Sequence, residues 1–318
     1  MSVRWTSKDM PSQRGRTIVV TGTGGLGFES GLALARAGGD VIIAGRNPAR
    51  GEEAVARIRK EVPGAAISFE RLDLADLRSI AACGQRLTAG RERIDVLINN
   101  AGVMTPPRRE VTADGFELQF GTNYLGHFAL TAHLMPLLRR GRDPRVVTLS
   151  SVAARGGRID FDDLHSQQRY KPMRAYSQSK LACLIFAFEL QRRSDQDGCG
   201  VTSIAAHPGV SRTDLLHNAP GRFSAPGLAR SLLWFLFQPA AQGALPALFA
   251  ATAREARKGG YYGPDRLGET RGYPVDARSP TASLDPVAAG RLWDRSVEMT
   301  GAMFGHSRGD AAGKLGQP

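Results

Sequence analysis

The feature that most constrains the fold of this chain is its regular alternation of short β-branched runs with longer segments of helical periodicity. Segments such as FESGLALARAGG and GEEAVARIRKEV carry apolar residues at helical spacing, and the runs between such segments have the composition of buried strands. The predicted strands are residues 17–21, 40–45, 66–73, 94–100, 145–150 and 201–207. Apolar strands that alternate with helices predict a parallel sheet with helices on both faces. The predicted fold class is therefore α/β and doubly wound.

A length of 318 residues suits one large domain or two small ones, and allows a substantial core. We predict a single domain at residues 15–304. The ends, 1–14 and 305–318, are polar and contain glycine, which predicts flexible segments.

Two further elements are predicted near the C-terminus. The stretch GGYYGP at 259–264 predicts one more edge strand. A late helix is predicted to start at Asp285, with Pro286 in its first turn, and to run to about Met299.

The net charge of +12 comes almost wholly from arginine, because the chain has only six lysines. Such a balance can indicate a nucleic acid or an anionic membrane as partner. The arginines are scattered, however, and the densest group is Arg139, Arg140, Arg142 and Arg145. A basic, solvated surface is therefore the favoured interpretation, and no nucleic-acid partner is predicted.

The cysteines Cys83, Cys183 and Cys199 are odd in number and lack metal-ligand spacing. This pattern suits a reducing compartment, in which each cysteine acts as a small buried hydrophobe. We therefore predict a cytoplasmic protein without a metal site.

One stretch needs weighing as a membrane span. Residues Ser231 to Thr252 carry no charge over a span-length window, but Pro239 and Pro246 interrupt it. Two helices, one packed and one over a pocket, are the favoured interpretation. A peripheral membrane contact through Trp234, Phe235 and Phe237 is left open.

A glycine-rich loop, VTGTGGLGFES at 19–29, joins the first predicted strand to the first helix. In a doubly wound fold ligands sit at this edge of the sheet. Gly22, Gly24 and Gly27 satisfy GxGxxG, which permits a tight turn, close backbone approach to a pyrophosphate and close helix packing. Such turns are common, so the loop alone predicts a dinucleotide only weakly.

The residue at the end of the second strand strengthens this interpretation. NAD-binding folds usually place a carboxylate there, on the ribose 2′-hydroxyl, whereas this chain has Arg46 followed by Asn47. A guanidinium can pair with a 2′-phosphate, so NADP(H) is predicted in preference to NAD(H). The alternative is an ordinary surface arginine.

The segment AYSQSK at 175–180 places Tyr176 and Lys180 four residues apart, on one helical face. A phenol with an ordinary pKa near 10 is a poor base at neutral pH, but an adjacent ammonium stabilises the phenolate. Such a pair also arises by chance, so its position after the fifth strand matters. That strand ends in Ser150 and Ser151, whose hydroxyls could reach the same crevice. Serine, tyrosine, lysine and a nicotinamide together could interconvert an alcohol and a carbonyl.

Over about residues 16 to 300 the chain resembles the short-chain dehydrogenases/reductases, which have a Rossmann-type fold. The matching motifs are TGxxGLG at 21–27, Asp73-Leu74, NNAG at 99–102, Asn123 in FGTNYLGH, Ser151, YxxxK at 176–180 and HPGVSRT at 207–213. Each motif is weak alone, but together they stand in the order of the family.

The resemblance implies a role for each catalytic residue. Tyr176 would be the general acid/base, Ser151 would orient the carbonyl, Lys180 would tune the tyrosine and bind ribose, and Asn123 would hold a proton-relay water.

The resemblance also implies where the cofactor lies. Asp73 would bind the adenine amine, NNAG would line the ribose and the central sheet, and HPGVSRT would meet the nicotinamide amide. Structural alternatives exist: Asn123 could be a solvent or cap residue, NNAG a strand-ending turn, and Asp73 a helix cap. The predicted cofactor-binding residues are Thr21, Gly22, Gly24, Gly25, Leu26, Gly27, Arg46, Asn47, Asp73, Leu74, Asn100, Ala101, Gly102, Tyr176, Lys180, Pro208, Gly209 and Thr213.

The glycine loop departs from the usual TGxxxGxG of the family, because Thr21 to Gly27 is one residue shorter. It can be aligned on the last two glycines or read as GxGxxG. The missing residue usually contributes a side chain near the 2′-phosphate, so Arg46 would have to contribute more of the NADP affinity.

Ser151 and Tyr176 are farther apart than in most of the family. The inserted segment 153–172 would lie on the rim of the crevice, and with 259–274 it resembles the retinol dehydrogenase and protochlorophyllide-reductase-like branch, which favours lipophilic substrates. A substrate lid is expected at about 211–240. Apolar wall candidates, which could equally be helix packing, are Leu215, Leu216, Phe223, Leu228, Trp234 and Phe235.

The function predicted from the sequence is NADP(H)-dependent interconversion of an alcohol and a carbonyl on an apolar or aromatic small molecule. A non-catalytic NADP-binding protein with the same fold is the alternative, and a binder of nucleic acid or membrane surfaces is a third class. The predicted partners are the small-molecule substrate and a second copy in a homodimer.

Overall fold

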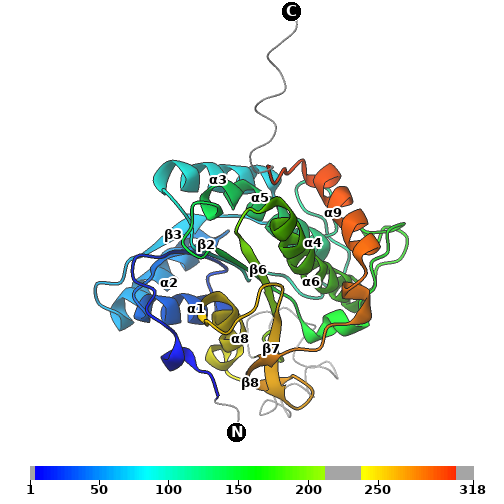
Figure 1. The fold of residues 1–318 in the computed structure, drawn as a ribbon. Helices are drawn as coiled ribbons and strands as arrows, with labels where there is room; N and C mark the ends of the chain where they lie inside the picture. The colour runs from blue at the N-terminus through cyan, green and yellow to red at the C-terminus, as the bar shows by residue number, and fades with distance from the viewer. Residues whose placement is uncertain (1–3, 212–237, 306–318) are drawn as a thin grey trace, which may run out of the picture.

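A computed structural model describes residues 4–211 and 238–305 (Figure 1). Within these residues one sheet has the strand order β3-β2-β1-β4-β5-β6-β7-β8, and all neighbours are parallel except β7 and β8. The strands are β1 (Thr17–Thr21), β2 (Asp40–Gly45), β3 (Ile67–Arg71), β4 (Val96–Asn99), β5 (Arg145–Leu149), β6 (Thr202–Ala206), β7 (Tyr261–Arg266) and β8 (Arg271–Asp276). The order reverses between β1 and β4, so the ends of these strands form the switch point at which such folds bind ligands.

Helices cover both faces of the sheet, as predicted (Figure 1). On one face lie α3 (Leu77–Gly90), α5 (Gly126–Leu138) and α6 (Pro172–Asp197), and α9 (Pro286–Thr300) packs on α6. On the other face lie α1 (Gly25–Arg36), α2 (Pro48–Glu61) and α8 (Ala240–Thr252). Short elements are α4 (Leu118–Phe120), the π-helix η2 (Gly121–Leu125), and the 3-10 helices η1 (Ser7–Asp9), η3 (Val152–Gly156) and η6 (Thr281–Ser283).

The alternation of side chains along the strands divides the core into two main layers. In β1, Val19 packs in the layer with α3, α5 and α6, whereas Ile18 and Val20 pack with α1, α2 and α8. All three side chains are fully buried. The strands are therefore apolar throughout because both of their faces are covered.

The C-terminal part confirms the predicted late helix and corrects two other expectations. The helix α9 starts at Pro286, and the Asp285 carboxylate accepts hydrogen bonds from Val287 N and Ala288 N. The stretch 259–264 contributes β7, but the antiparallel strand β8 forms the edge of the sheet. Pro246 lies inside α8 instead of ending a helix, because the apolar packing of α8 against α1 and the sheet outweighs one lost backbone hydrogen bond.

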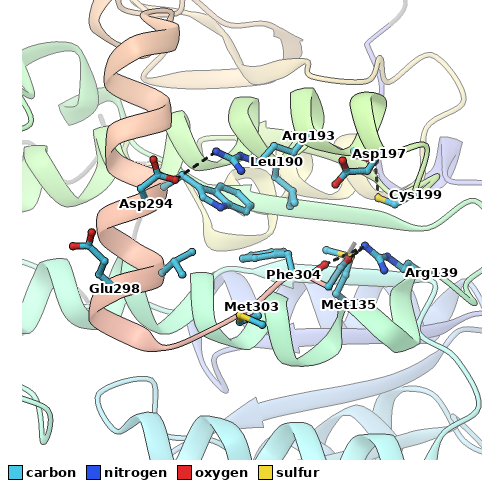
Figure 2. Close-up of a pocket in the computed structure, with 14 residues that line it drawn as sticks. Met135, Arg139, Leu190, Arg193, Asp197, Cys199, Asp294, Glu298, Met303 and Phe304 are labelled. Carbon is cyan, nitrogen blue, oxygen red and sulfur yellow. Dashed lines mark hydrogen bonds and ion pairs between the residues drawn. The ribbon is translucent and has the colours of Figure 1, made fainter. Parts of the chain in front are cut away.

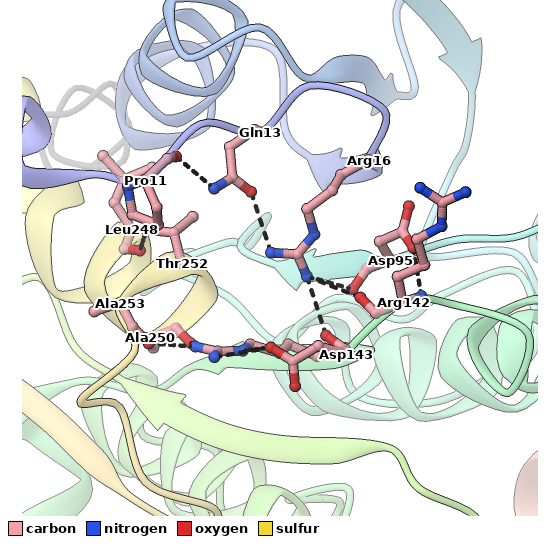
Figure 3. Close-up of polar contacts among 11 residues, drawn as sticks. Pro11, Gln13, Arg16, Asp95, Arg142, Asp143, Leu248, Ala250, Thr252 and Ala253 are labelled. Carbon is pink, nitrogen blue, oxygen red and sulfur yellow. Dashed lines mark hydrogen bonds and ion pairs between the residues drawn. The ribbon is translucent and has the colours of Figure 1, made fainter.

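The N-terminal segment is also corrected where the structure describes it. Residues 4–14 pack on the domain because Trp5 makes an edge contact with Phe249 and Met10 joins the same apolar layer. Gln13 is buried, donates to the carbonyl of Pro11 and accepts from Arg16 (Figure 3). The predicted flexible end at 306–318 lies outside the described residues.

A polar network lies at the N-terminal ends of the central strands, opposite the switch point. The fully buried Asp95 carboxylate accepts from Thr17 N at 2.7 Å and Arg142 N at 2.6 Å. Arg16 donates to the carbonyls of Asp95 and Asp143, and Arg145 donates to Ala250 and Ala253 in the same region (Figure 3). Part of the arginine excess is thus used to satisfy backbone carbonyls.

Candidate active site

The glycine loop forms a tight turn between β1 and α1. Gly22 has φ +102°, and a Cβ on Gly27 would collide with the Gly22 carbonyl. Gly24 is the N-cap residue, and Gly25 starts the helix. The first and last glycines of GxGxxG are therefore required by backbone conformation and close approach. Leu26 is buried in the α1–α8 layer, so only its backbone faces the turn.

The NNAG motif locks this turn to the end of β4. The Thr21 hydroxyl accepts from Asn100 N and Ala101 N at 2.9 Å each, and Asn100 Nδ2 donates to the Thr21 carbonyl at 2.7 Å. Asn100 Nδ2 also lies where a Cβ on Gly22 or Gly27 would point. The Asn100 amide is thus part of the structure of the loop.

A cavity of about 180 Å³ lies beside the glycine loop, at the ends of β1, β2 and β3. It brings together many of the predicted cofactor residues from separate parts of the chain. These residues are Gly22, Arg46, Asn47, Asp73, Leu74, Ala101 and Gly102. Asp73 accepts from Ala75 N at 3.0 Å in a local turn, whereas Asp76 is the N-cap of α3, so the alternative role of Asp73 as a helix cap is wrong.

Three polar residues that the sequence reasoning did not single out also line this cavity. Thr23 lies in the shortened turn, and Arg50 lies in the first turn of α2, four residues after Arg46, which precedes the helix. No helical-face pattern relates Arg50 to Arg46, and only its closeness to Arg46 in the sequence could have drawn attention to it. Thr122 has a buried hydroxyl without a hydrogen-bond partner among the described residues, and no sequence pattern announces it.

These features fit a bound dinucleotide. Glycines that allow close backbone approach, a buried hydroxyl without a partner and two exposed guanidinium groups all meet at one cavity. The N-terminus of α1 adds backbone N–H groups suited to an anion.

The predicted catalytic residues lie on α6 and at the end of β5. Lys180 is buried, and its Nζ donates to the Leu149 carbonyl at 3.1 Å. Tyr176 lies one helical turn earlier and is 9% exposed. Ser150 donates to the Lys180 carbonyl, so its hydroxyl is used to join β5 to α6. Ser151 is the N-cap of η3 and accepts from Ala153 N at 3.2 Å.

Asn123 sits in the π-helix η2, a local irregularity that often marks a functional position. Its Oδ1 accepts from Val103 N at 2.7 Å, and its Nδ2 donates to the Val103 carbonyl and to Ser179 Oγ, both at 3.0 Å. A Cβ on Gly102 would lie 2.9 Å from Asn123 Oδ1 and 3.6 Å from Lys180 Nζ. The Asn123 amide therefore joins the segment after β4 to α6, and Lys180 lies beside it.

His127, which the sequence reasoning missed, links Asn123 to the glycine loop. Its Nδ1 contacts the Asn123 carbonyl and its Nε2 contacts Thr21 Oγ1, each at 2.9 Å. A carbonyl cannot donate, so Nδ1 carries the proton and Thr21 donates to Nε2. Burial lowers the pKa of His127 to about 4, which keeps this tautomer neutral at neutral pH.

The HPG segment follows β6. Pro208 accepts from Ser211 Oγ at 2.8 Å and from Gln238 Nε2 at 2.6 Å, and Gly209 has φ +63°. Thr213 lies outside the described residues, as do the six apolar wall candidates and most of the predicted lid.

The inserted segment 153–172 packs against the 103–120 region. Tyr170 OH donates to the Pro106 carbonyl at 2.9 Å and accepts from Gln119 Nε2 at 3.2 Å. The His165 ring stacks on Phe116 at 5.4 Å between centroids. The insertion therefore braces the chain that follows β4.

A larger cavity of about 450 Å³ lies elsewhere, between α5, α6, α9 and residues 303–305 (Figure 2). Its walls include Trp293 and Phe304, and its rim carries charges of both signs, such as Arg139 and Asp294. None of the predicted site residues lines it. Cavity size alone would therefore point away from the predicted site residues.

Two features are absent from residues 4–211 and 238–305. No group of histidine, cysteine, aspartate and glutamate side chains there has the arrangement of a metal site. In the same part of the chain, no helix is long and apolar enough to cross a membrane.

Comparison with known proteins agrees with this geometry. The family model for short chain dehydrogenase matches residues 16–221. Retinol dehydrogenase 13 of Mus musculus is 41% identical over 301 residues, covering 92% of this chain and 86% of the relative. Polyprenol dehydrogenase of Mus musculus is 40% identical over 308 residues, covering 95% and 89%.

A solved structure extends the similarity to three dimensions. An uncharacterized protein from Mycobacterium Paratuberculosis is 38% identical and superimposes with a TM-score of 0.79, over 95% of this chain and all of that chain. The chain thus belongs to the short-chain dehydrogenase/reductase family, in its retinol dehydrogenase-like branch, and is an NAD(P)-dependent dehydrogenase/reductase.

Proposed function

We propose that this protein interconverts an alcohol and a carbonyl on an apolar small molecule, with NADP(H) as cofactor and Ser151, Tyr176 and Lys180 as catalytic residues. One observation carries the proposal: the buried ammonium of Lys180 lies beside Gly102 and Asn123, one helical turn from Tyr176. A buried lysine is costly unless its charge is used, and Leu149 supplies one acceptor for its three protons.

In this proposal the nicotinamide supplies or accepts the hydride. Ser151 donates a hydrogen bond to the substrate oxygen and holds the reacting carbon in place. Tyr176 exchanges a proton with the same oxygen, and Lys180 stabilises its phenolate form. Asn123 positions this group by joining Val103 to Ser179, and its proposed relay water would bind beside that junction.

The NADP preference rests on two arginines rather than one. Arg46 and Arg50 are exposed, line the cavity beside the glycine loop, and have no side-chain partner within the described residues. A phosphate on the ribose would supply that partner. Arg50 thus compensates for the residue missing from the turn.

The proposed substrate class follows from the relatives. Similar proteins are named for retinol and polyprenol, which are apolar isoprenoid alcohols. An isoprenoid alcohol or its aldehyde is therefore the proposed substrate, in either direction of hydride transfer.

The test measures the oxidation of NADPH, and in parallel of NADH, by the purified protein with retinal or a short polyprenal as substrate. The proposal expects turnover with NADPH that Tyr176→Phe abolishes. Tight NADPH binding without turnover on any apolar aldehyde or alcohol would instead favour the non-catalytic NADP-binding alternative.

The predicted location and pairing also remain proposals. A cytoplasmic location is supported by Cys83, Cys183 and Cys199, all free thiols. A homodimer would have to leave the packing of α9 in place, because Trp293 contacts Phe128 on α5 and Phe186 on α6 within one chain. A second copy would therefore have to use a surface outside this contact, which light scattering and cross-linking can test.

A further inference from the structure

The tip of the β7–β8 hairpin is held in an unusual backbone conformation. Leu267, Gly268 and Glu269 have φ values of +49°, +64° and +67°. This left-handed region is unfavourable for leucine and glutamate, and it persists only where surrounding contacts enforce it. The contacts of Glu269 show what enforces it here.

The Glu269 carboxylate joins three separate segments. One oxygen lies 2.6 Å from an Arg155 nitrogen and 2.9 Å from His207 Nε2. The other accepts from Arg278 N at 3.1 Å. Burial raises the pKa of Glu269, but hydrogen bonds from His207 and Arg278 and the charge of Arg155 lower it by more. The pKa is therefore below its ordinary value, and the carboxylate is ionised at neutral pH.

His207 is built into the interior beside this carboxylate. Its Nδ1 accepts from Gly209 N at 3.2 Å, so Nε2 carries the proton that it donates to Glu269. The ring fills the space that a Cβ on Gly263 would need. Burial lowers the pKa of His207 despite the carboxylate, so the contact joins a neutral ring to an anion.

The hairpin also supports the HPG segment through the backbone. Val210 N donates to the Thr270 carbonyl at 2.7 Å, and Gly209 is so close to Thr270 that a Cβ there would collide with its carbonyl. The position of residues 208–210 is therefore set by the hairpin tip.

Arg155 connects the same tip to the other side of the crevice. It lies in η3, the short helix that Ser151 caps, and donates to the Gly268 carbonyl at 3.1 Å as well as to Glu269. One carboxylate thus ties the segment that follows Ser151 to the segment that follows β6.

We propose that Glu269, together with Arg155 and His207, is a positioning residue that fixes the HPG segment relative to Ser151 and so shapes the nicotinamide half of the cofactor site. This rests on the proposed function, which assigns the nicotinamide to that half. The adenosine half, at Arg46 and Thr122, has no contact with the hairpin tip among the hydrogen bonds and ion pairs of the described residues.

The experiment compares two ligands on each variant by calorimetry. NADP⁺ carries a nicotinamide, whereas adenosine 2′,5′-bisphosphate carries only the adenosine half. For Glu269→Ala we expect NADP⁺ affinity to fall about tenfold with the fragment unchanged. Glu269→Gln, which can still accept from His207, should lose less NADP⁺ affinity. Arg155→Met should lose about as much NADP⁺ affinity as Glu269→Gln.

The matched control is Glu61→Gln, which removes another ion pair, with Arg36, far along the chain from the hairpin. It should leave both affinities unchanged. Thermal unfolding of every variant separates lost stability from lost positioning.

The pH dependence gives an independent check with a definite sign. The pKa of Glu269 is lowered in the folded protein. The contribution of its ionised carboxylate is therefore fully present above the ordinary pKa of 4.5 and is lost as pH falls through the lower folded pKa. The ratio of the NADP⁺ affinity of the wild type to that of Glu269→Ala should therefore be constant near neutral pH and should decrease in acid.

The outcomes separate this inference from the proposed function. Equal loss of affinity for NADP⁺ and for the fragment in Glu269→Ala would show general destabilisation and overturn the positioning role. A wild type that binds both ligands without turnover would contradict the proposed function. The comparison of the two ligands would still test whether Glu269 positions the HPG segment. A wild type that binds neither ligand would contradict both.

Discussion

The two ends of the predicted cofactor crevice are built differently. At the adenosine end, Arg46 and Arg50 are exposed and Thr122 has an unpaired hydroxyl, within the described residues. At the catalytic end, Asn123 and Lys180 are buried and already hydrogen-bonded within the protein. The comparison indicates that one end is completed by its ligand, whereas the other is prearranged before any ligand binds.

The same contrast separates affinity from rate. Groups that lack partners gain them from the cofactor, so changes at the adenosine end should alter binding. Groups fixed by the fold should alter the rate of the chemical step, because they set geometry and proton transfer. Five substitutions test this division, in order of decreasing expected effect.

Tyr176→Phe should have the largest effect. Removing the acid/base hydroxyl is expected to lower kcat about a thousandfold with little change in NADPH affinity. Steady-state kinetics and fluorescence titration measure the two quantities. Tyr273→Phe removes a hydroxyl on β8 and serves as the control. A Tyr176→Phe variant with normal kcat would remove tyrosine from the mechanism.

Gly27→Ala should rank second and weaken NADPH binding more than tenfold, roughly 1.4 kcal/mol or more. The added Cβ would collide with the Gly22 carbonyl and deform the turn. Gly290→Ala is the control, since its Cβ would meet nothing within 4 Å in α9. Normal NADPH affinity in Gly27→Ala would mean that the turn does not bind the pyrophosphate.

Arg46→Ala and Arg50→Ala should each weaken NADPH binding about tenfold and leave NADH binding unchanged. Because both side chains are exposed, the loss should shrink at high salt. Titrations with both nucleotides at two ionic strengths measure this. If the ratio of NADPH to NADH affinity is the same in the variants, the cofactor preference has another origin.

Thr122→Val should have the smallest effect, a loss of about threefold in nucleotide affinity. Thr148→Val is a matched control, because Thr148 has another buried hydroxyl without a partner among the described residues, but outside the cavity. Both variants should keep or raise the melting temperature, since each removes an unpaired buried hydroxyl. Equal affinities in the two variants would show that Thr122 does not meet the ligand.

Periodicity and motifs predicted the features that depend on local sequence. The six parallel strands, the helix from Asp285 and the gathering of Arg46, Asp73 and Gly102 at one cavity follow from apolar runs, caps and strand order. These signals are local or shared by the family, so they can be read from one chain.

The features that were missed depend on contacts between distant residues. Trp5 packs on Phe249, which turns a polar end of the chain into part of the domain. Pro246 remains helical because its neighbours are buried. His127 and Glu269 matter through partners far away in the sequence, Thr21 and Arg155, which no periodic pattern connects.

The most direct test of the central claim is a single-turnover reaction with retinal, comparing NADPH with NADH and wild type with Tyr176→Phe. The account predicts rapid oxidation of NADPH by the wild type, slower oxidation of NADH, and no burst with Tyr176→Phe despite normal NADPH binding. Equal bursts in the wild type and Tyr176→Phe would contradict the proposed chemistry. Equal rates with NADPH and NADH would contradict the proposed role of Arg46 and Arg50.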